Sequence, residues 1–125
     1  MNVLFIFILM VFCHIVDDYY LQGWLASAKQ KDWWKKNAPH PMYSLDYIWA
    51  LIMHAFSWSF MIMLPIAFKL SFNADIIFIA CFAANVVVHA VVDDLKANRK
   101  KINLWVDQLI HIMQIILTIL VFLIF

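Results

Sequence analysis

Four long apolar runs, separated by short polar segments, dominate the chain. Each run is long enough to cross a lipid bilayer as a helix that rises about 1.5 Å per residue. The predicted spans cover residues 3–22, 45–68, 76–95 and 103–125. Connections this short favour neighbouring helices of opposite direction. The pattern therefore predicts an all-α protein, a four-helix transmembrane bundle in up-down-up-down order, with residues 1–125 as a single domain.

The segment between the first two runs, residues 23–44, has a different character. Its lysines and tryptophans are Lys29, Lys31, Lys35, Lys36, Trp24, Trp33 and Trp34, and it ends in Pro39-His40-Pro41. Lysine mixed with tryptophan is typical of a helix at the level of the lipid headgroups, and proline stops a helix. We therefore expect a short interfacial helix here, with the tryptophans as membrane anchors and not as a substrate platform.

Basic residues predict the orientation of the bundle. Eight of the nine lie in residues 23–44 and 96–102, and only Lys69 lies on the opposite side. Because loops rich in lysine and arginine stay in the cytoplasm, both of these loops are predicted to be cytoplasmic and both termini outside. The chain is then an integral protein of an inner or plasma membrane.

Composition supports a membrane location and narrows the classes of partner. Hydrophobic residues make up 66% of the 125 residues, charged residues only 14%, and the mean hydropathy is +0.86. A soluble domain of this size could not bury so much apolar surface, so membrane lipids are the expected surroundings. The net charge of +1 gives no reason to expect a nucleic-acid partner. Cys13 and Cys81 lie in different runs and are expected to be packing residues.

Ionisable residues inside the spans are the most informative positions. Each costs several kcal/mol in a membrane unless it is paired or bound to a metal. Three spans carry a histidine and an aspartate four residues apart, a spacing that places both on one helix face. The pairs are His14 with Asp18, His89 with Asp93, and Asp107 with His111, and the second span adds His54.

The depth of these residues predicts that they meet. Counted from the predicted cytoplasmic ends, the four histidines lie about 9 to 14 Å deep and the three aspartates about 3 to 6 Å deep. Helices of alternating direction would thus supply a layer of histidines beneath a layer of aspartates.

We predict that these seven residues bind one or two divalent transition-metal ions. Mixed imidazole and carboxylate donors suit zinc, manganese or iron, and helical bundles build dinuclear sites in this way. Zinc is the metal we favour. Asp17 and Asp94 are the candidate catalytic residues, and Asn85 and Gln108 are expected to support the ligands.

Other interpretations of the same residues stay open. The histidine and aspartate pairs could satisfy one another by hydrogen bonds between helices, and His54 could be a hydrogen-bonded packing residue. Paired histidines on facing helices can also ligate haem. His40, between two prolines, is expected to be an ordinary surface residue.

Taken in order, the polar residues form an extended pattern. It reads His14-x-x-x-Asp18-Tyr-x-x-Gln22, Lys29, His54, His89-x-x-x-Asp93-x-x-Lys96 and Asp107-Gln108-x-x-His111. This pattern resembles a group of small bacterial and phage membrane proteins classed as a domain of unknown function, over nearly the whole chain. More loosely, it is similar to the membrane-embedded metal-dependent hydrolases. Asp17 and Asp94 double the acidic positions, which leaves open which carboxylate of each pair is the ligand.

The leading hypothesis is a membrane-embedded metal-dependent hydrolase acting on a lipid or lipid-linked substrate at the cytoplasmic face. An unligated aspartate, Asp17 or Asp94, would serve as general base for phosphoester or acyl-ester cleavage. The alternatives are a metal or proton carrier, a metal sensor, and a non-enzymatic phage-type membrane protein. The sequence does not fix the substrate or the metal, and leaves open whether the chain forms a homo-oligomer.

Overall fold

Four long helices make up most of the protein. The computed structural model describes residues 2–125. The long helices are α1 (Val3–Ile15) with its continuation η1 (Val16–Leu21), α4 (Asp46–Lys69), α5 (Ile76–Ala97) and α6 (Leu104–Ile124). All four are long and apolar enough to cross a membrane. The predicted all-α class with four apolar spans is confirmed, while the up-down order and the orientation in the membrane stay predictions.

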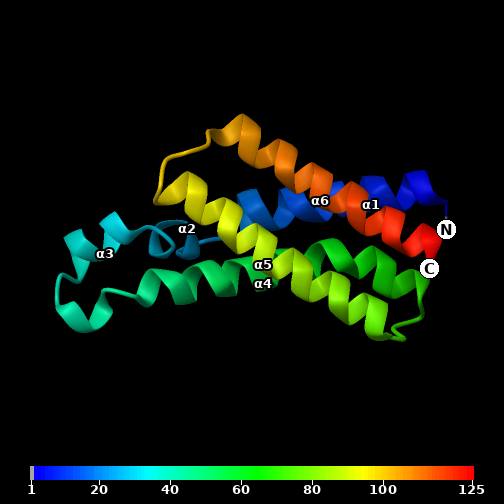
Figure 1. Cartoon of the computed structure of the whole chain (residues 1–125), viewed down its shortest axis with the longest axis horizontal. Helices are drawn as coiled ribbons and strands as arrows, with labels where there is room; N and C mark the ends of the chain where they lie inside the picture. The colour runs from blue at the N-terminus through cyan, green and yellow to red at the C-terminus, as the bar shows by residue number, and fades with distance from the viewer. Residues whose placement is uncertain (1) are drawn as a thin grey trace.

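The long helices enclose one interior. Helix α4 packs against α1 and α5, and α6 packs against α5 and α1, which closes a ring. Both termini lie at one end of the bundle, and α2, α3 and the α5–α6 connection lie toward the other end (Figure 1). Any residue that faces inward from a long helix can therefore meet residues from the other three.

The interior divides into an apolar half and a polar half. Toward the termini the helices bury an apolar core, formed by Ile6, Met10, Trp58, Ile62, Met63, Ile66, Ile115 and Ile119. Many large apolar side chains on the outer surface are exposed, as expected for helices that face lipid. Buried histidines and aspartates fill the other half of the interior, where a membrane protein tolerates them only with partners.

Two short helices connect the first and second spans, where the sequence predicted one. They are α2 (Leu25–Ala28) and α3 (Lys31–Asn37), followed by a 3₁₀ turn at Pro41–Tyr43. Gly23, with φ of 54°, turns the chain after η1 in a left-handed conformation that suits glycine. Gln30 is extended, which separates α2 from α3. Residues after Gly23 can therefore fold back toward the bundle.

The first span ends in a π-helix, η1, which the hydrophobic pattern did not predict. In a regular α-helix two successive side chains point about 100° apart, so only one of Asp17 and Asp18 would face the interior well. Both are buried here, with exposed fractions of 1% and 8%. The local widening of the π-helix brings two adjacent carboxylates into the bundle, and such segments are frequent at functional sites.

Candidate metal centre

Six of the seven predicted ligands come together inside the bundle, and all six are buried. They form what we call the His/Asp cluster: Asp18 of η1, His54 of α4, His89 and Asp93 of α5, and Asp107 and His111 of α6. Three overlapping groups have ligand atoms within 4.8 Å of one another, namely Asp18-His54-His89, His89-Asp93-His111 and Asp18-Asp107-His111. The cluster could therefore hold a metal ion.

One part of the cluster is centred on His54. Its Nε2 atom lies 3.2 Å from Nε2 of His89, 3.2 Å from Oδ1 of Asp18 and 3.4 Å from Oδ2 of Asp93. Ligand atoms placed 2.0–2.1 Å from a tetrahedral zinc ion lie about 3.3 Å from one another. The distances from His54 to one imidazole and two carboxylates are therefore close to the spacing of ligand atoms around such an ion.

The other part is centred on His111. Its Nε2 atom lies 3.3 Å from Oδ1 of Asp107 and 3.6 Å from Oδ1 of Asp93. All three atoms are buried without a hydrogen-bond partner. Asp93 joins the two parts, because its Oδ2 atom faces His54 while its Oδ1 atom faces His111.

A hydrogen-bond network fixes the tautomer of His111. Gln114 donates from Nε2 to the side-chain oxygen of Asn85, 3.1 Å away, so its own oxygen must accept. That oxygen lies 3.1 Å from Nδ1 of His111, which therefore carries the proton in the neutral ring. Thr118 completes the network: its hydroxyl accepts from Asn85 and donates to the backbone carbonyl of Gln114. The network leaves the Nε2 lone pair of His111 aimed at two carboxylates.

Unpaired buried atoms are concentrated at this site. In the part of the chain that the structure describes, eight buried side-chain nitrogen and oxygen atoms have no hydrogen-bond partner. Six of them belong to the cluster and to Asp17 beside it: Oδ2 of Asp17, Nδ1 of His54, Nδ1 of His89, Oδ1 of Asp93, Oδ1 of Asp107 and Nε2 of His111. Each such atom costs about 1–3 kcal/mol when it stays unpaired. The site therefore concentrates buried donor atoms that a metal ion could bind.

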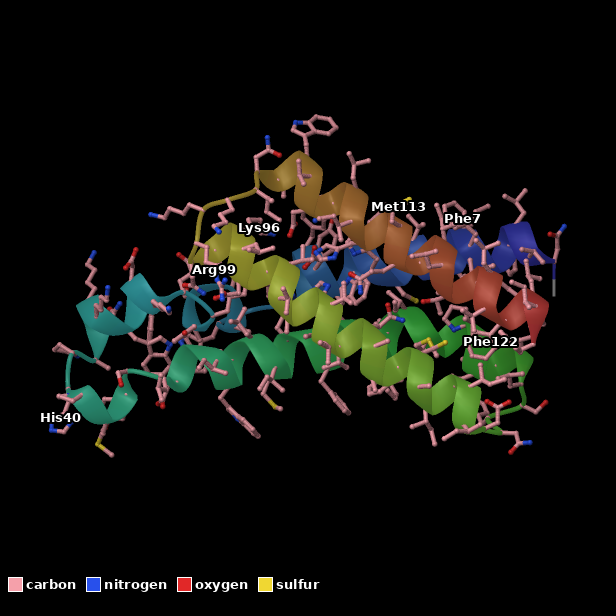
Figure 2. All side chains as sticks on the ribbon, viewed as in Figure 1. Phe7, His40, Lys96, Arg99, Met113 and Phe122 are labelled. Atoms are coloured by element: carbon pink, nitrogen blue, oxygen red, sulfur yellow. The ribbon has the colours of Figure 1, made fainter. Side chains whose placement is uncertain are left out.

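Two lysines neutralise part of its negative charge. Nζ of Lys29 lies 2.6 Å from Oδ2 of Asp93, and Nζ of Lys96 lies 2.6 Å from Oδ2 of Asp107. Lys96 is close to the end of α5 (Figure 2). Together with Asp17, the three cluster aspartates provide four carboxylates against two ammonium groups. With neutral imidazoles two negative charges remain, which is the charge that one divalent cation balances.

His14 lies beside the cluster with both ring nitrogens engaged. Trp58 donates from Nε1 to Nδ1 of His14 at 2.8 Å, so Nε2 of His14 carries the proton and donates to Gln108 at 2.9 Å. The Trp58 ring also stacks on the His89 ring, with centroids 4.2 Å apart. The His111 ring stacks on the same His89 ring, with centroids 4.1 Å apart. His14 belongs to none of the three groups of possible ligands.

The two predicted catalytic aspartates occupy different places. Asp17 accepts from Ser57 at 2.6 Å, and its Oδ2 atom lies 3.8 Å from Nδ1 of His54. Asp94 is not brought into the cluster, because it accepts from Asn98 and from Arg99, each at 2.8 Å. Its position five residues after His89 turns it away from the interior.

His40 lies at the tip of the segment between α3 and α4, far from the cluster (Figure 2). It is exposed, as expected for a surface residue. Its Nδ1 atom accepts from the backbone of Met42 at 3.2 Å.

Sequence reasoning missed several residues of the site. The sequence places Lys29 among the interfacial lysines and Lys96 in the basic loop, but both contact buried carboxylates. Trp58 and Ser57 gave no signal, because an apolar ring and a small hydroxyl are ordinary in a span. The one pointer was the extended polar pattern, in which Lys29 and Lys96 stand beside the His and Asp pairs.

The fold and the site together define a class: a helical membrane bundle with a buried histidine and aspartate centre that could hold a metal ion. Comparison with family models, with curated proteins and with solved structures finds no match for the chain. The resemblance to small bacterial and phage membrane proteins thus stays a prediction.

Proposed function

We propose that the protein is a metal-dependent hydrolase that acts on a lipid or lipid-linked phosphoester at the cytoplasmic face of the membrane. The observation that carries the proposal is the meeting of the Nε2 lone pair of His111 with unpaired oxygens of Asp93 and Asp107. With a neutral His111 ring, these three acceptors repel one another unless a cation lies among them, and this supports a metal ion at the site. Imidazole and carboxylate donors in this number favour zinc, with manganese or iron as alternatives.

The ligands divide into two donor sets that share one residue. Asp18, His54, His89 and Oδ2 of Asp93 form one set, and Asp107, His111 and Oδ1 of Asp93 form the other. The two sets would hold one ion or two, with Asp93 contributing to both sets, as residues on facing helices do in other helical bundles. A bound divalent ion would supply Lewis acidity and a nucleophilic water at neutral pH.

The remaining polar side chains have supporting tasks. Asp17 faces Nδ1 of His54 at 3.8 Å, and a carboxylate in that position orients a ligating histidine. We therefore assign Asp17 to hold His54, and a carboxylate of the cluster to take up the proton released by water.

The two lysines favour an anionic substrate. Lys29 and Lys96 place an ammonium group at each donor set, where each can bind a nonbridging oxygen of a phosphate. A neutral acyl ester has no anionic oxygen for these ammonium groups to bind. The lysines therefore support phosphoester over acyl-ester cleavage.

The arrangement of the interior argues against the carrier alternative. From His111 the polar network continues through Gln114, Asn85 and Thr118 and is followed toward the termini by the apolar core. A transported ion would have to cross that core without ligands, at a cost of several kcal/mol. A centre with polar groups in only one half of the bundle suits catalysis better than transport.

Elemental analysis of the protein purified in detergent tests the proposal. We expect one or two ions of zinc, manganese or iron per chain. His54→Ala and His111→Ala should each lose this metal. The His40→Ala variant should keep its metal, since that ring is exposed and far from the centre. Circular dichroism checks that the helices persist. Full metal content in both cluster variants, or no metal in the wild type after purification with added zinc, would end the proposal.

A further inference from the structure

A groove on the outer surface leads to the cluster. It has a volume of about 580 Å³ and lies between the end of the first span and the first half of α6. Most of its walls are apolar, and the lining residues are Val11, His14, Ile15, Tyr19, Tyr20, Leu104, Trp105, Gln108 and Ile112. Two of these residues, His14 and Gln108, are polar groups already described beside the cluster.

Gln108 separates the groove from the cluster. Its Nε2 atom donates to Oδ2 of Asp18 at 3.1 Å and to Oδ2 of Asp107 at 3.0 Å, and its oxygen accepts from His14 at 2.9 Å. A single amide side chain therefore lies between an apolar surface groove and two carboxylates of the candidate metal centre.

The surroundings of the groove specify its occupant. Both walls belong to helices that are long and apolar enough to span a membrane, so the groove faces lipid, where a hydrocarbon chain and not water fills it. Its volume falls in the range of about 300–1,000 Å³ that is usual for small-ligand sites. Tyr19, Tyr20 and Trp105 are exposed at the groove, and such aromatic residues prefer the headgroup level.

A second groove provides the contrast. It has a volume of about 240 Å³ between α4 and α5, and its lining residues are Phe60, Met63, Leu64, Ala67, Ala74, Phe78, Ile79 and Phe82. Every one of them is apolar, and none hydrogen-bonds to the cluster through its side chain. A lipid chain in this groove would lie against no residue of the His/Asp cluster.

We propose that the α1–α6 groove binds the hydrocarbon chain of an amphiphile whose phosphate headgroup reaches the His/Asp cluster past Gln108. The substrate then enters sideways from the lipid and not from the aqueous phase. The headgroup part of this proposal rests on the proposed hydrolase function. The chain part rests on the groove alone.

Photolabelling tests the site. The probe is hexadecyl phosphate with a diazirine on its chain, added to the full chain in phosphatidylcholine vesicles with zinc, and labelled peptides are mapped by mass spectrometry. We expect labelling to concentrate on residues that line the α1–α6 groove. Unlabelled hexadecyl phosphate should compete at least about tenfold better than hexadecanol, because only the phosphate can reach the centre.

Matched substitutions locate the chain. Ile15 and Ile79 line the two grooves with exposed fractions of 41% and 54%, so a tryptophan at either position fills its groove without entering the core. Ile15→Trp should lower labelling of the α1–α6 groove by about tenfold or more, and Ile79→Trp should leave it unchanged. Leu104→Trp, on the opposite wall, repeats the block should Ile15→Trp fail to fold.

The outcomes separate the two proposals. Equal labelling of both grooves, or labelling that neither Ile15→Trp nor Leu104→Trp lowers, would overturn the proposed binding site in the α1–α6 groove. The hydrolase proposal would still stand if the wild-type protein contains metal. Equal competition by hexadecanol would overturn the headgroup assignment. A metal-free wild type that still labels only in the α1–α6 groove, with a preference for phosphate, would end the hydrolase proposal and support the groove.

Discussion

Asp93 is the residue on which the charges of the centre converge. One of its oxygens accepts from Lys29 at 2.6 Å and lies 3.4 Å from His54, and the other lies 3.6 Å from His111. Its neighbour Asp94 instead accepts from Arg99 at the end of α5. Two aspartates adjacent in the sequence therefore have separate surroundings, and only Asp93 is a ligand in our proposal.

This difference gives a matched pair of variants. Asp93→Asn should lower the affinity for zinc by at least about 100-fold, because both donor sets lose a ligand. It should also lower the thermal stability, since Lys29 stays buried without its partner, at a cost of about 3–5 kcal/mol. Asp94→Asn should leave the zinc affinity unchanged. Zinc titration against a chelator checks both, and equal affinities in the two variants would contradict the assignment.

Gln114 sets the tautomer of His111 and offers a prediction of its own. Gln114→Met keeps the volume of the side chain but removes the acceptor of the Nδ1 proton. Zinc affinity should then fall about 10- to 100-fold while the helices persist. Gln30→Met is the control, because Gln30 is exposed and hydrogen-bonds only within its own segment. An unchanged zinc affinity in Gln114→Met would show that the network does not orient the ligand.

The sequence predicts which residues lie close together in the site better than it predicts the role of each residue. The four-residue spacing and the common depth point to all seven ligand candidates, because helix geometry alone determines both. Those criteria do not separate His14 from His111. The separation comes from Trp58 and Gln108, whose contacts with His14 exist only once the helices have packed. Lys29 lies outside the four spans, so no helical period relates it to the cluster.

Among the elements, the segment of α2 and α3 is tied to the end of α5 by the side chain of Asn98. Asn98, just after α5, accepts from the backbone of Lys31 at 2.8 Å and donates to the carbonyl of Lys29 at 3.0 Å. Asp94 accepts from the same amide group at 2.8 Å. This clamp carries the backbone of Lys29 to the point from which its ammonium group reaches Asp93.

Removal of the clamp should loosen the segment. In Asn98→Ala we expect amide hydrogen exchange in residues 25–31 to speed up by about tenfold or more. The reason is that the Lys31 N–H and the Lys29 carbonyl lose their hydrogen-bond partner. Exchange in the four spans should stay as in the wild type. Asn73→Ala, at the opposite end of the bundle, is the control. Exchange mass spectrometry in detergent measures the effect, and an unchanged rate in residues 25–31 would rule out the clamp.

Hydropathy predicts the four spans because length and composition decide them. Length and composition do not reveal η1, since a π-helix differs from an α-helix by a local change in hydrogen bonding and not by its residues. The division of the interfacial segment into α2 and α3 escapes prediction for a related reason. It depends on the contacts of one residue, Asn98, from a distant part of the chain.

The distribution of lysine and arginine between the two ends of the bundle predicts a fixed orientation of the protein in the membrane. Single cysteines test it in a background with Cys13→Ser and Cys81→Ser. Lys100→Cys lies in the basic α5–α6 connection and Asn73→Cys in the α4–α5 connection at the other end. A membrane-impermeant maleimide added to intact cells should label Asn73→Cys only, and should label Lys100→Cys after permeabilisation. The reverse pattern would place the centre toward the outside.

The apolar core near the termini has a consequence for the cell that carries this protein. In the described residues 2–125, this core, which includes Ile62, Met63 and Ile115, offers no ligand to an ion across that half of the bundle. Protons and metal ions that reach the centre must return by the side from which they came. Even at high expression the protein should therefore not make the bilayer permeable to ions, and the cell should keep its proton gradient while it makes the protein.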